Sequence, residues 1–131
     1  MKAQASAAIA PILLIEDEPS VTAFLRAALE RHGYAVANAA SGAEGLKMLS
    51  GGKYFGVISD IRMPGAVNGA EVHAWIQKNR PELCARIILI SGDTANSETQ
   101  AFLAQSGTPC IEKPFRVQQL MNIVEKTFGK P

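Results

Sequence analysis

The sequence predicts one α/β domain in which five parallel strands form an open, doubly wound sheet with helices on both faces. Three observations predict it: short apolar runs alternate with stretches of helical spacing, two of these runs are apolar throughout, and 131 residues suit one compact domain. The runs are Ile12–Ile15, Tyr34–Ala37, Gly56–Ser59, Ile87–Ile90 and Pro109–Ile111. The uninterrupted apolar character of Ile12–Ile15 and Ile87–Ile90 is typical of strands buried on both faces.

The first two helices of this (βα)5 pattern have signals at their ends. Val21, Leu25 and Leu29 fall on one helix face, and a glycine at position 33 follows as a stop. Ser41 and Glu44 form an S-x-x-E capping box, in which each side chain accepts a hydrogen bond from a backbone amide at a helix start. We expect that second helix to end near the glycine pair at positions 51 and 52.

Three further helices are predicted from apolar residues at helical spacing. In chain order these residues are Val72 and Ile76; Thr99, Phe102 and Leu103; and Val117, Leu120, Met121, Val124 and Phe128. Pro81 follows the first group and Gly107 follows the second, as is common after helix ends. The last group has the clearest helical period, and its apolar face is expected to pack against the sheet.

The composition restricts the classes of function. A formal net charge of +1 indicates no basic surface for nucleic acid, and no apolar run approaches the roughly 20 residues of a membrane span. Residues 1–10 are too weakly apolar for a secretory signal and are interpreted as a flexible lead-in to a domain at 11–131. Cys84 and Cys110 form no C-x-x-C pattern, which favours free thiols in a reducing cytoplasm.

Polar residues with complementary chemistry follow four of the five predicted strands. Glu16 and Asp17 follow the first, and Asp60, Ser91 and Lys113 follow later ones. Because ligands bind at the carboxyl ends of strands in doubly wound sheets, we expect these side chains to converge at one edge. Three crowded carboxylates repel one another, and a magnesium ion would relieve that repulsion. A lysine and a hydroxyl beside them suit a phosphoryl group carried on an aspartate.

Each of these residues also has an ordinary structural explanation. Glu16 and Asp17 alone could be a charge pair at a helix start, and Asp60 could be a turn residue. Ser91 before a glycine could serve a loop, and Lys113 could be a solvated charge. The conjunction favours a site, since complementary groups directly after four strands are improbable by chance.

Four stretches of the sequence resemble the response-regulator receiver domains of two-component signalling: ILLIEDEPSV, VISDIRMPG, IILISGD and EKPF. The resemblance runs from about Ile12 to Phe128, and the stretches are highly specific together although each is weak alone. It implies a flavodoxin-like receiver fold, Mg²⁺ as cofactor and a cytoplasmic phosphoprotein of a phosphorelay. It also implies a histidine kinase or histidine phosphotransfer protein as partner, and a monomer or weak dimer.

The resemblance implies a role for each matching residue. Asp60 would be the phosphoacceptor, Ser91 the switch hydroxyl, and Lys113 the contact to the phosphoryl group. The bond from Lys113 to Pro114 is expected to be cis, which is uncommon and usually a specific feature. Gly92, directly after Ser91, would let the backbone approach the phosphoryl oxygens closely.

The resemblance also implies a metal shell. Asp17 and Asp60 would bind Mg²⁺ directly, and Glu16 would act through water or as a weaker ligand. The backbone carbonyl of Arg62 would complete the protein's share. We also hypothesise that Arg62 and Asp93 form an ion pair that partly covers the pocket, although two solvated charges explain them equally well.

The sequence departs from the family pattern in three places. Cys110 stands three residues before the lysine, where the family usually has an aromatic residue whose rotamer follows the switch hydroxyl. The loop at 63–69 is one residue longer than the common form and is expected to re-aim the third helix or alter partner contacts. Glu16 replaces the commoner aspartate, which leaves metal binding intact.

Three other functions remain to be weighed. A receiver-like module that binds partners without phosphorylation is left open by Cys110. An aspartyl-phosphate phosphatase would carry a second aspartate two residues after the nucleophile, where this chain has Arg62. A flavin phosphate would be repelled by three carboxylates. The chain is expected to catalyse only its own phosphorylation and dephosphorylation, either alone, within a relay, or as the last domain of a hybrid histidine kinase.

Overall fold

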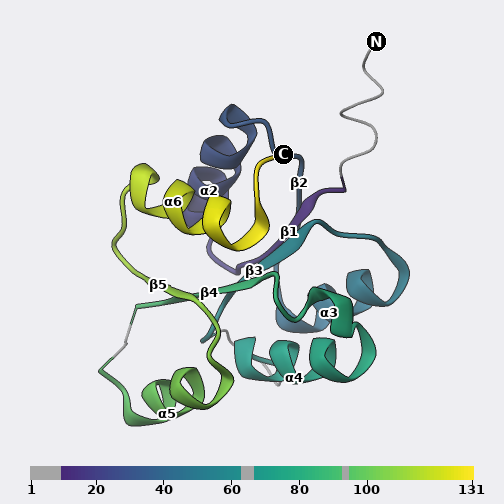
Figure 1. Ribbon diagram of the computed structural model, residues 1–131, viewed down its shortest axis with the longest axis vertical. Coiled ribbons are helices and arrows are strands. Elements are labelled where there is room, and N and C mark those ends of the chain that lie inside the picture. The colour runs from purple at the N-terminus through teal and green to yellow at the C-terminus, as the bar shows by residue number, and fades with distance from the viewer. Residues whose placement is uncertain (1–9, 63–66, 93–94) are drawn as a thin grey trace.

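The computed structural model describes residues 10–62, 67–92 and 95–131, so nearly all of the predicted lead-in lies outside the described residues. Five parallel strands form one sheet in the order β2-β1-β3-β4-β5, which confirms the predicted fold (Figure 1). The strands are β1 (Ile12–Ile15), β2 (Val36–Ala39), β3 (Gly56–Asp60), β4 (Ile87–Ser91) and β5 (Cys110–Glu112).

Helices cover both faces of this sheet. They are α2 (Pro19–Arg31), α3 (Gly42–Gly51), α4 (Gly69–Asn79), α5 (Ser97–Ser106) and α6 (Val117–Phe128), with a 3-10 turn at Pro81–Leu83. Helices α2 and α6 lie together on one face, and α3, α4 and α5 lie on the other (Figure 1). The arrangement is doubly wound, as the alternation of strands and helices predicts.

The two halves of the core follow from the alternation of side chains along the strands. Ile58 and Ile90 pack toward α2 and α6, whereas Val57 and Leu89 pack toward α3 and α4. All of β1 is buried, which explains its uninterrupted apolar sequence. Both faces of the central strands are therefore covered, and their carboxyl ends remain as the place where polar groups can gather.

The second strand begins later than the sequence predicts. Tyr34 is buried, but its N–H donates to the carbonyl of Leu29 at the end of α2, and its hydroxyl donates to the carbonyl of Gly129 at 2.7 Å. It therefore belongs to the connection after α2 rather than to the strand. Strand β2 instead continues through Asn38 and Ala39, because register with β1 fixes its position more strongly than local strand propensity. Strand β5 is likewise displaced by one residue, to Cys110–Glu112.

Candidate functional site

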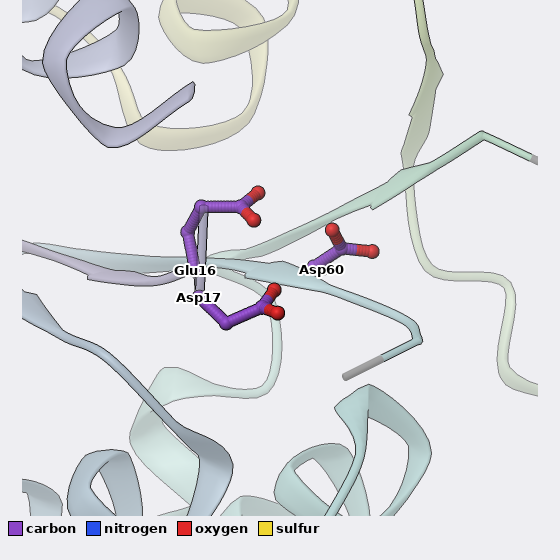
Figure 2. A group of neighbouring side chains, drawn as sticks. All are labelled: Glu16, Asp17 and Asp60. Carbon is purple, nitrogen blue, oxygen red and sulfur yellow. The ribbon is translucent and has the colours of Figure 1, made fainter. Parts of the chain in front are cut away.

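Three carboxylates meet where β1 and β3 end side by side. Glu16 and Asp17 directly follow β1, and Asp60 is the last residue of β3. One oxygen from each of the three lies within 4.8 Å of the others, and Figure 2 shows the carboxyl groups of Glu16 and Asp17 turned toward Asp60. After β1 the chain continues to β2 on one side of the sheet, whereas after β3 it continues to β4 on the other side. The cluster therefore lies at the topological switch point of the sheet.

Lys113, in the segment after β5, joins this cluster from the other side. Its Nζ lies 2.9 Å from Oδ2 of Asp60 and 3.5 Å from Oε1 of Glu16. Its backbone N–H donates to the carbonyl of Ser91 at 2.8 Å, which fixes the end of β5 against the end of β4. The expected cis bond between Lys113 and Pro114 is present. The lysine predicted from the sequence thus belongs to the same site as the acids.

The surroundings of Glu16 raise the pKa of its carboxyl group. Its side chain is almost wholly buried, and this burial, together with the negative charge of Asp60, raises its pKa to about 7. The backbone N–H of Glu18 and the Lys113 ammonium act in the opposite direction. One oxygen, Oε2, accepts from that N–H at 3.1 Å. The other, Oε1, is buried and accepts no hydrogen bond among the described residues.

These groups suit a magnesium ion. Mg²⁺ prefers oxygen ligands and is commonly bound by one or two carboxylates. Its positive charge relieves the repulsion between neighbouring carboxylates. Glu16, Asp17 and Asp60 offer three such oxygens close together, and the buried Oε1 of Glu16 accepts no hydrogen bond among the described residues, although the Lys113 ammonium lies 3.5 Å away. The donor set therefore fits a hard divalent cation, as the sequence predicts.

Local structure after β3 holds Asp60 in place. Its Oδ1 accepts from the backbone N–H of Arg62 at 3.2 Å, and its own carbonyl accepts from the hydroxyl of Ser59 at 3.0 Å. Gly69, the first residue of α4, donates its N–H to Ile61 at 2.9 Å. A Cβ at position 69 would lie 2.6 Å from the carbonyl oxygen of Asp60, so this close approach requires glycine.

The longer loop before α4 leads into a helix start that is fixed by a capping box. Residues 63–66 lie outside the described residues. Asn68 is the N-cap of α4: its Oδ1 accepts from the N–H of Glu71 at 3.0 Å, and Glu71 accepts in return from the N–H of Asn68 at 3.4 Å. This reciprocal capping box fixes the helix directly behind Asp60.

Ser91 and Cys110 lie at the other end of the site. Ser91 is buried, and strand alternation directs its side chain to the same sheet face as that of Cys110, which packs on the side of α3, α4 and α5. Burial raises the pKa of the Cys110 thiol to about 11, with further contributions from the negative charges of Glu112 and Asp60. The thiol therefore stays protonated at neutral pH and is a small packing group.

The structure adds one residue and leaves two predictions open. Glu18 was not predicted as part of the site, yet its Oε1 lies 3.5 Å from Nζ of Lys113. The signal in the sequence is a third acid in the run Glu16–Glu18, although a helix start also explains such a charge. The side chain of Arg62 is exposed, and metal ligation by its carbonyl stays a prediction. Asp93 lies outside the described residues, so its ion pair with Arg62 also stays a prediction.

The sequence matches a known family model and several curated proteins. The model is described as the response regulator receiver domain and matches residues 12–125. The transcriptional regulatory protein TcrA of Mycobacterium tuberculosis is 31% identical over 83% of this chain, which spans 42% of TcrA. The sensor kinase CckA of Brucella abortus is 32% identical over 92% of this chain, which spans 13% of CckA. The response regulator receiver protein CpdR of Brucella abortus is 31% identical, and the match covers 88% of this chain and 93% of CpdR.

Solved structures share the same fold. A CheY-like response regulator receiver domain from Methanospirillum hungatei has a TM-score of 0.82 and 25% identity, covering 92% of this chain and 94% of that one. The response regulator TrrA of Thermotoga maritima, solved in complex with Mg²⁺ and BeF, has a TM-score of 0.77 and 33% identity, covering 91% of this chain and 99% of TrrA.

Proposed function

Because the chain belongs to the family of response regulator receiver domains, we propose that it accepts a phosphoryl group from a partner phosphohistidine onto Asp60. One observation carries the proposal: Asp60 lies between two acids at the end of β1 and the ammonium of Lys113. This arrangement combines a nucleophilic carboxylate, a set of metal ligands and a fixed positive charge.

Mg²⁺ would be held by Glu16, Asp17 and Asp60, with the backbone carbonyl of Arg62 as a further ligand. When bound, the ion would neutralise charge on the oxygens of the transferred phosphoryl group. The structure of TrrA with Mg²⁺ and BeF supports this expectation, since BeF mimics a phosphoryl group and TrrA is a relative of similar length.

The residues of this chain supply the rest of the chemistry. An oxygen of the Asp60 carboxylate forms a bond to phosphorus, while the bond from phosphorus to the histidine nitrogen breaks and its electron pair stays on the imidazole. Lys113 lies 2.9 Å from the same carboxylate and neutralises charge on the incoming oxygens. The hydroxyl of Ser91 donates to one of them. Positioning and charge stabilisation are the main tasks of a protein in phosphoryl transfer.

Phosphorylation would be transmitted through Ser91 to the surface formed by α5, β5 and α6. The new phosphate draws the hydroxyl of Ser91 inward, which biases the protein between two conformations. Cys110 lies on the same sheet face as Ser91 and fills less volume than the aromatic residue usual in the family. The conformational change in this chain therefore depends on repacking around a small side chain rather than on rotation of a ring.

The proposed partner is a histidine kinase or a histidine phosphotransfer protein in the cytoplasm. TcrA and CckA are much longer than this chain, whereas CpdR has nearly its length. A stand-alone receiver, a relay intermediate and the last domain of a hybrid kinase are all consistent with these lengths. Within the described residues, no helix has the length and apolar character needed to cross a bilayer.

Uptake of beryllofluoride distinguishes this function from a receiver that only binds partners. We expect one equivalent to bind in the presence of Mg²⁺, detected by ¹⁹F NMR, and no binding to an Asp60→Asn variant. Binding of Mg²⁺ without uptake of beryllofluoride would favour the interaction module. Turnover of a small phosphate ester would instead favour a phosphatase, although position 62 holds Arg where such an enzyme needs an acid.

A further inference from the structure

Glu18 lies at the rim of the acidic cluster and shares the ammonium of Lys113 with Asp60. Nζ of Lys113 is 3.5 Å from Oε1 of Glu18 and 2.9 Å from Oδ2 of Asp60. The Glu18 side chain is 59% exposed, whereas that of Asp60 is 8% exposed. The lysine is therefore held between a buried acid at the reacting position and an exposed acid at the mouth of the site.

The contact with Lys113 distinguishes the Glu18 carboxylate from that of an ordinary helix start. Glu18 is the N-cap of α2, but its side chain makes no capping hydrogen bond. Its backbone N–H donates to Oε2 of Glu16, a contact that any residue except proline would keep. In the described part of the chain, Lys113 is the one cationic side chain within ion-pair distance of Glu18. Replacing the carboxylate by an amide therefore removes a charge while leaving the local backbone contacts in place.

The charge of Glu18 differs in kind from the charges of Glu16, Asp17 and Asp60. Those three offer oxygens within 4.8 Å of one another and would be compensated by a bound divalent ion. Glu18 is outside this set, and its exposed carboxylate lies 3.5 Å from the ammonium that would contact the incoming phosphoryl group. A negative charge at the mouth of such a site lowers the local concentration of anions.

Resting on the proposed phosphotransfer, we infer that Glu18 is a specificity-determining residue that disfavours small dianionic phosphoryl donors relative to less charged donors. Two effects of its negative charge both slow the reaction with a dianionic donor. It repels the approaching anion, and it competes with that anion for the Lys113 ammonium. A phosphohistidine delivered by a protein partner can offset this repulsion with cationic groups of its own, whereas a free acyl phosphate cannot.

Two small donors of different charge test the inference. Acetyl phosphate is a dianion at neutral pH and phosphoramidate is a monoanion, so the ratio of their phosphorylation rates reports the charge at the mouth. We expect the Glu18→Gln variant to raise the ratio of acetyl phosphate to phosphoramidate by roughly 3- to 10-fold at low salt, with the gain shrinking as ionic strength rises. Glu18→Lys should raise the ratio further.

Glu125→Gln is the matched control. It removes the same charge from the exposed surface of α6. This end of α6 also carries Phe128, which packs on Gly56, the first residue of β3. Asp60 is at the opposite end of that strand, so the donor ratio of this variant should equal that of the unmodified chain. Circular dichroism of all variants checks that the fold is unchanged.

The possible outcomes separate this inference from the proposed function. An unchanged donor ratio in Glu18→Gln, or an equal rate increase with both donors, would overturn the selective role of Glu18 while leaving phosphorylation of Asp60 intact. Failure of both donors to label Asp60, together with failure to take up beryllofluoride in the presence of Mg²⁺, would overturn the proposed function and this inference together.

Discussion

Lys113 donates a hydrogen bond of 2.9 Å to Oδ2 of Asp60 across 53 residues of sequence. Strand β4 lies between β3, which ends at Asp60, and β5, which Lys113 directly follows, so the pair spans the carboxyl edge of the sheet. Both side chains are largely buried, and the same ammonium lies 3.5 Å from the buried Glu16. The lysine therefore balances part of the negative charge that the strand ends bring together.

Removing this ammonium should destabilise the protein when Mg²⁺ is absent. Lys113→Met leaves Asp60 and Glu16 without their cation, and we expect a loss of about 1–3 kcal/mol in the free energy of unfolding at neutral pH. The loss should be smaller than for a fully buried pair because the Lys113 side chain is 22% exposed. Urea denaturation in EDTA measures it, with the exposed Lys47→Met as control. Equal stability of the two variants would show that solvent already compensates the acids.

The raised pKa of Glu16 predicts a specific dependence of stability on pH. Its folded-state pKa of about 7 exceeds the ordinary value of 4.5, so the folded state binds more protons between these values. This group therefore contributes stability that is complete below about pH 4.5 and is lost as the pH rises through about 7. The contribution corresponds to roughly 2–4 kcal/mol.

Urea denaturation without Mg²⁺ at about pH 5 and about pH 8 gives the free energy of unfolding of the unmodified chain and of Glu16→Gln, and the difference between them measures this contribution. The unmodified chain should lose more stability over this interval than Glu16→Gln, which cannot ionise at that position. Addition of Mg²⁺ at the higher pH should restore stability to the unmodified chain, because the ion compensates the ionised cluster. Parallel pH profiles of the two proteins would contradict the assignment.

The close contact between Gly69 and Asp60 predicts a sharp difference between two glycine substitutions. A Cβ at Gly69 would lie 2.6 Å from the carbonyl oxygen of Asp60 and 2.7 Å from Cα of Ile61, both of which are backbone atoms. Gly69→Ala should therefore cost about 1–3 kcal/mol and displace Asp60. Gly51→Ala meets no atom within 4 Å at the end of α3 and should be neutral or slightly stabilising. Thermal denaturation compares them, and equal melting temperatures would contradict the packing described.

Cys110 should react slowly with iodoacetamide in the folded protein. The pKa of Cys110 is raised to about 11 by burial and by nearby negative charge. Relative to a free thiol with the ordinary pKa of 9.0, its thiolate fraction at neutral pH falls by about 100-fold. In a Cys84→Ser variant, alkylation of the native protein should thus be much slower than alkylation of the same protein in urea. Similar rates in both states would show that Cys110 is accessible and ionisable.

The sequence predicts the fold and most of the site for one physical reason. Parallel strands place their carboxyl ends at one edge, so residues directly after the strands must converge once the strands are identified. This reasoning locates Glu16, Asp17, Asp60, Ser91 and Lys113 without reference to coordinates. It applies to these positions because each lies at the end of a strand or within two residues after it.

Other features depend on tertiary contacts that local patterns do not contain. Tyr34 is buried because it packs in the core beside α2 and α6, with its hydroxyl bonded to the carbonyl of Gly129 near the end of the chain, so the strand predicted from its apolar character is wrong. The role of Glu18 depends on how far Lys113 reaches from the segment after β5. The sequence identifies Cys110 as unusual, but the rise in its pKa requires the surroundings that burial creates.

The most direct test of the central claim is labelling by acetyl phosphate with Mg²⁺, followed by mass spectrometry of the intact protein and of its peptides. The account predicts one phosphoryl group on Asp60 in the unmodified chain, lost when Mg²⁺ is chelated beforehand, and none in Asp60→Asn. Stoichiometric labelling of another residue, or equal labelling of the Asn variant, would contradict it.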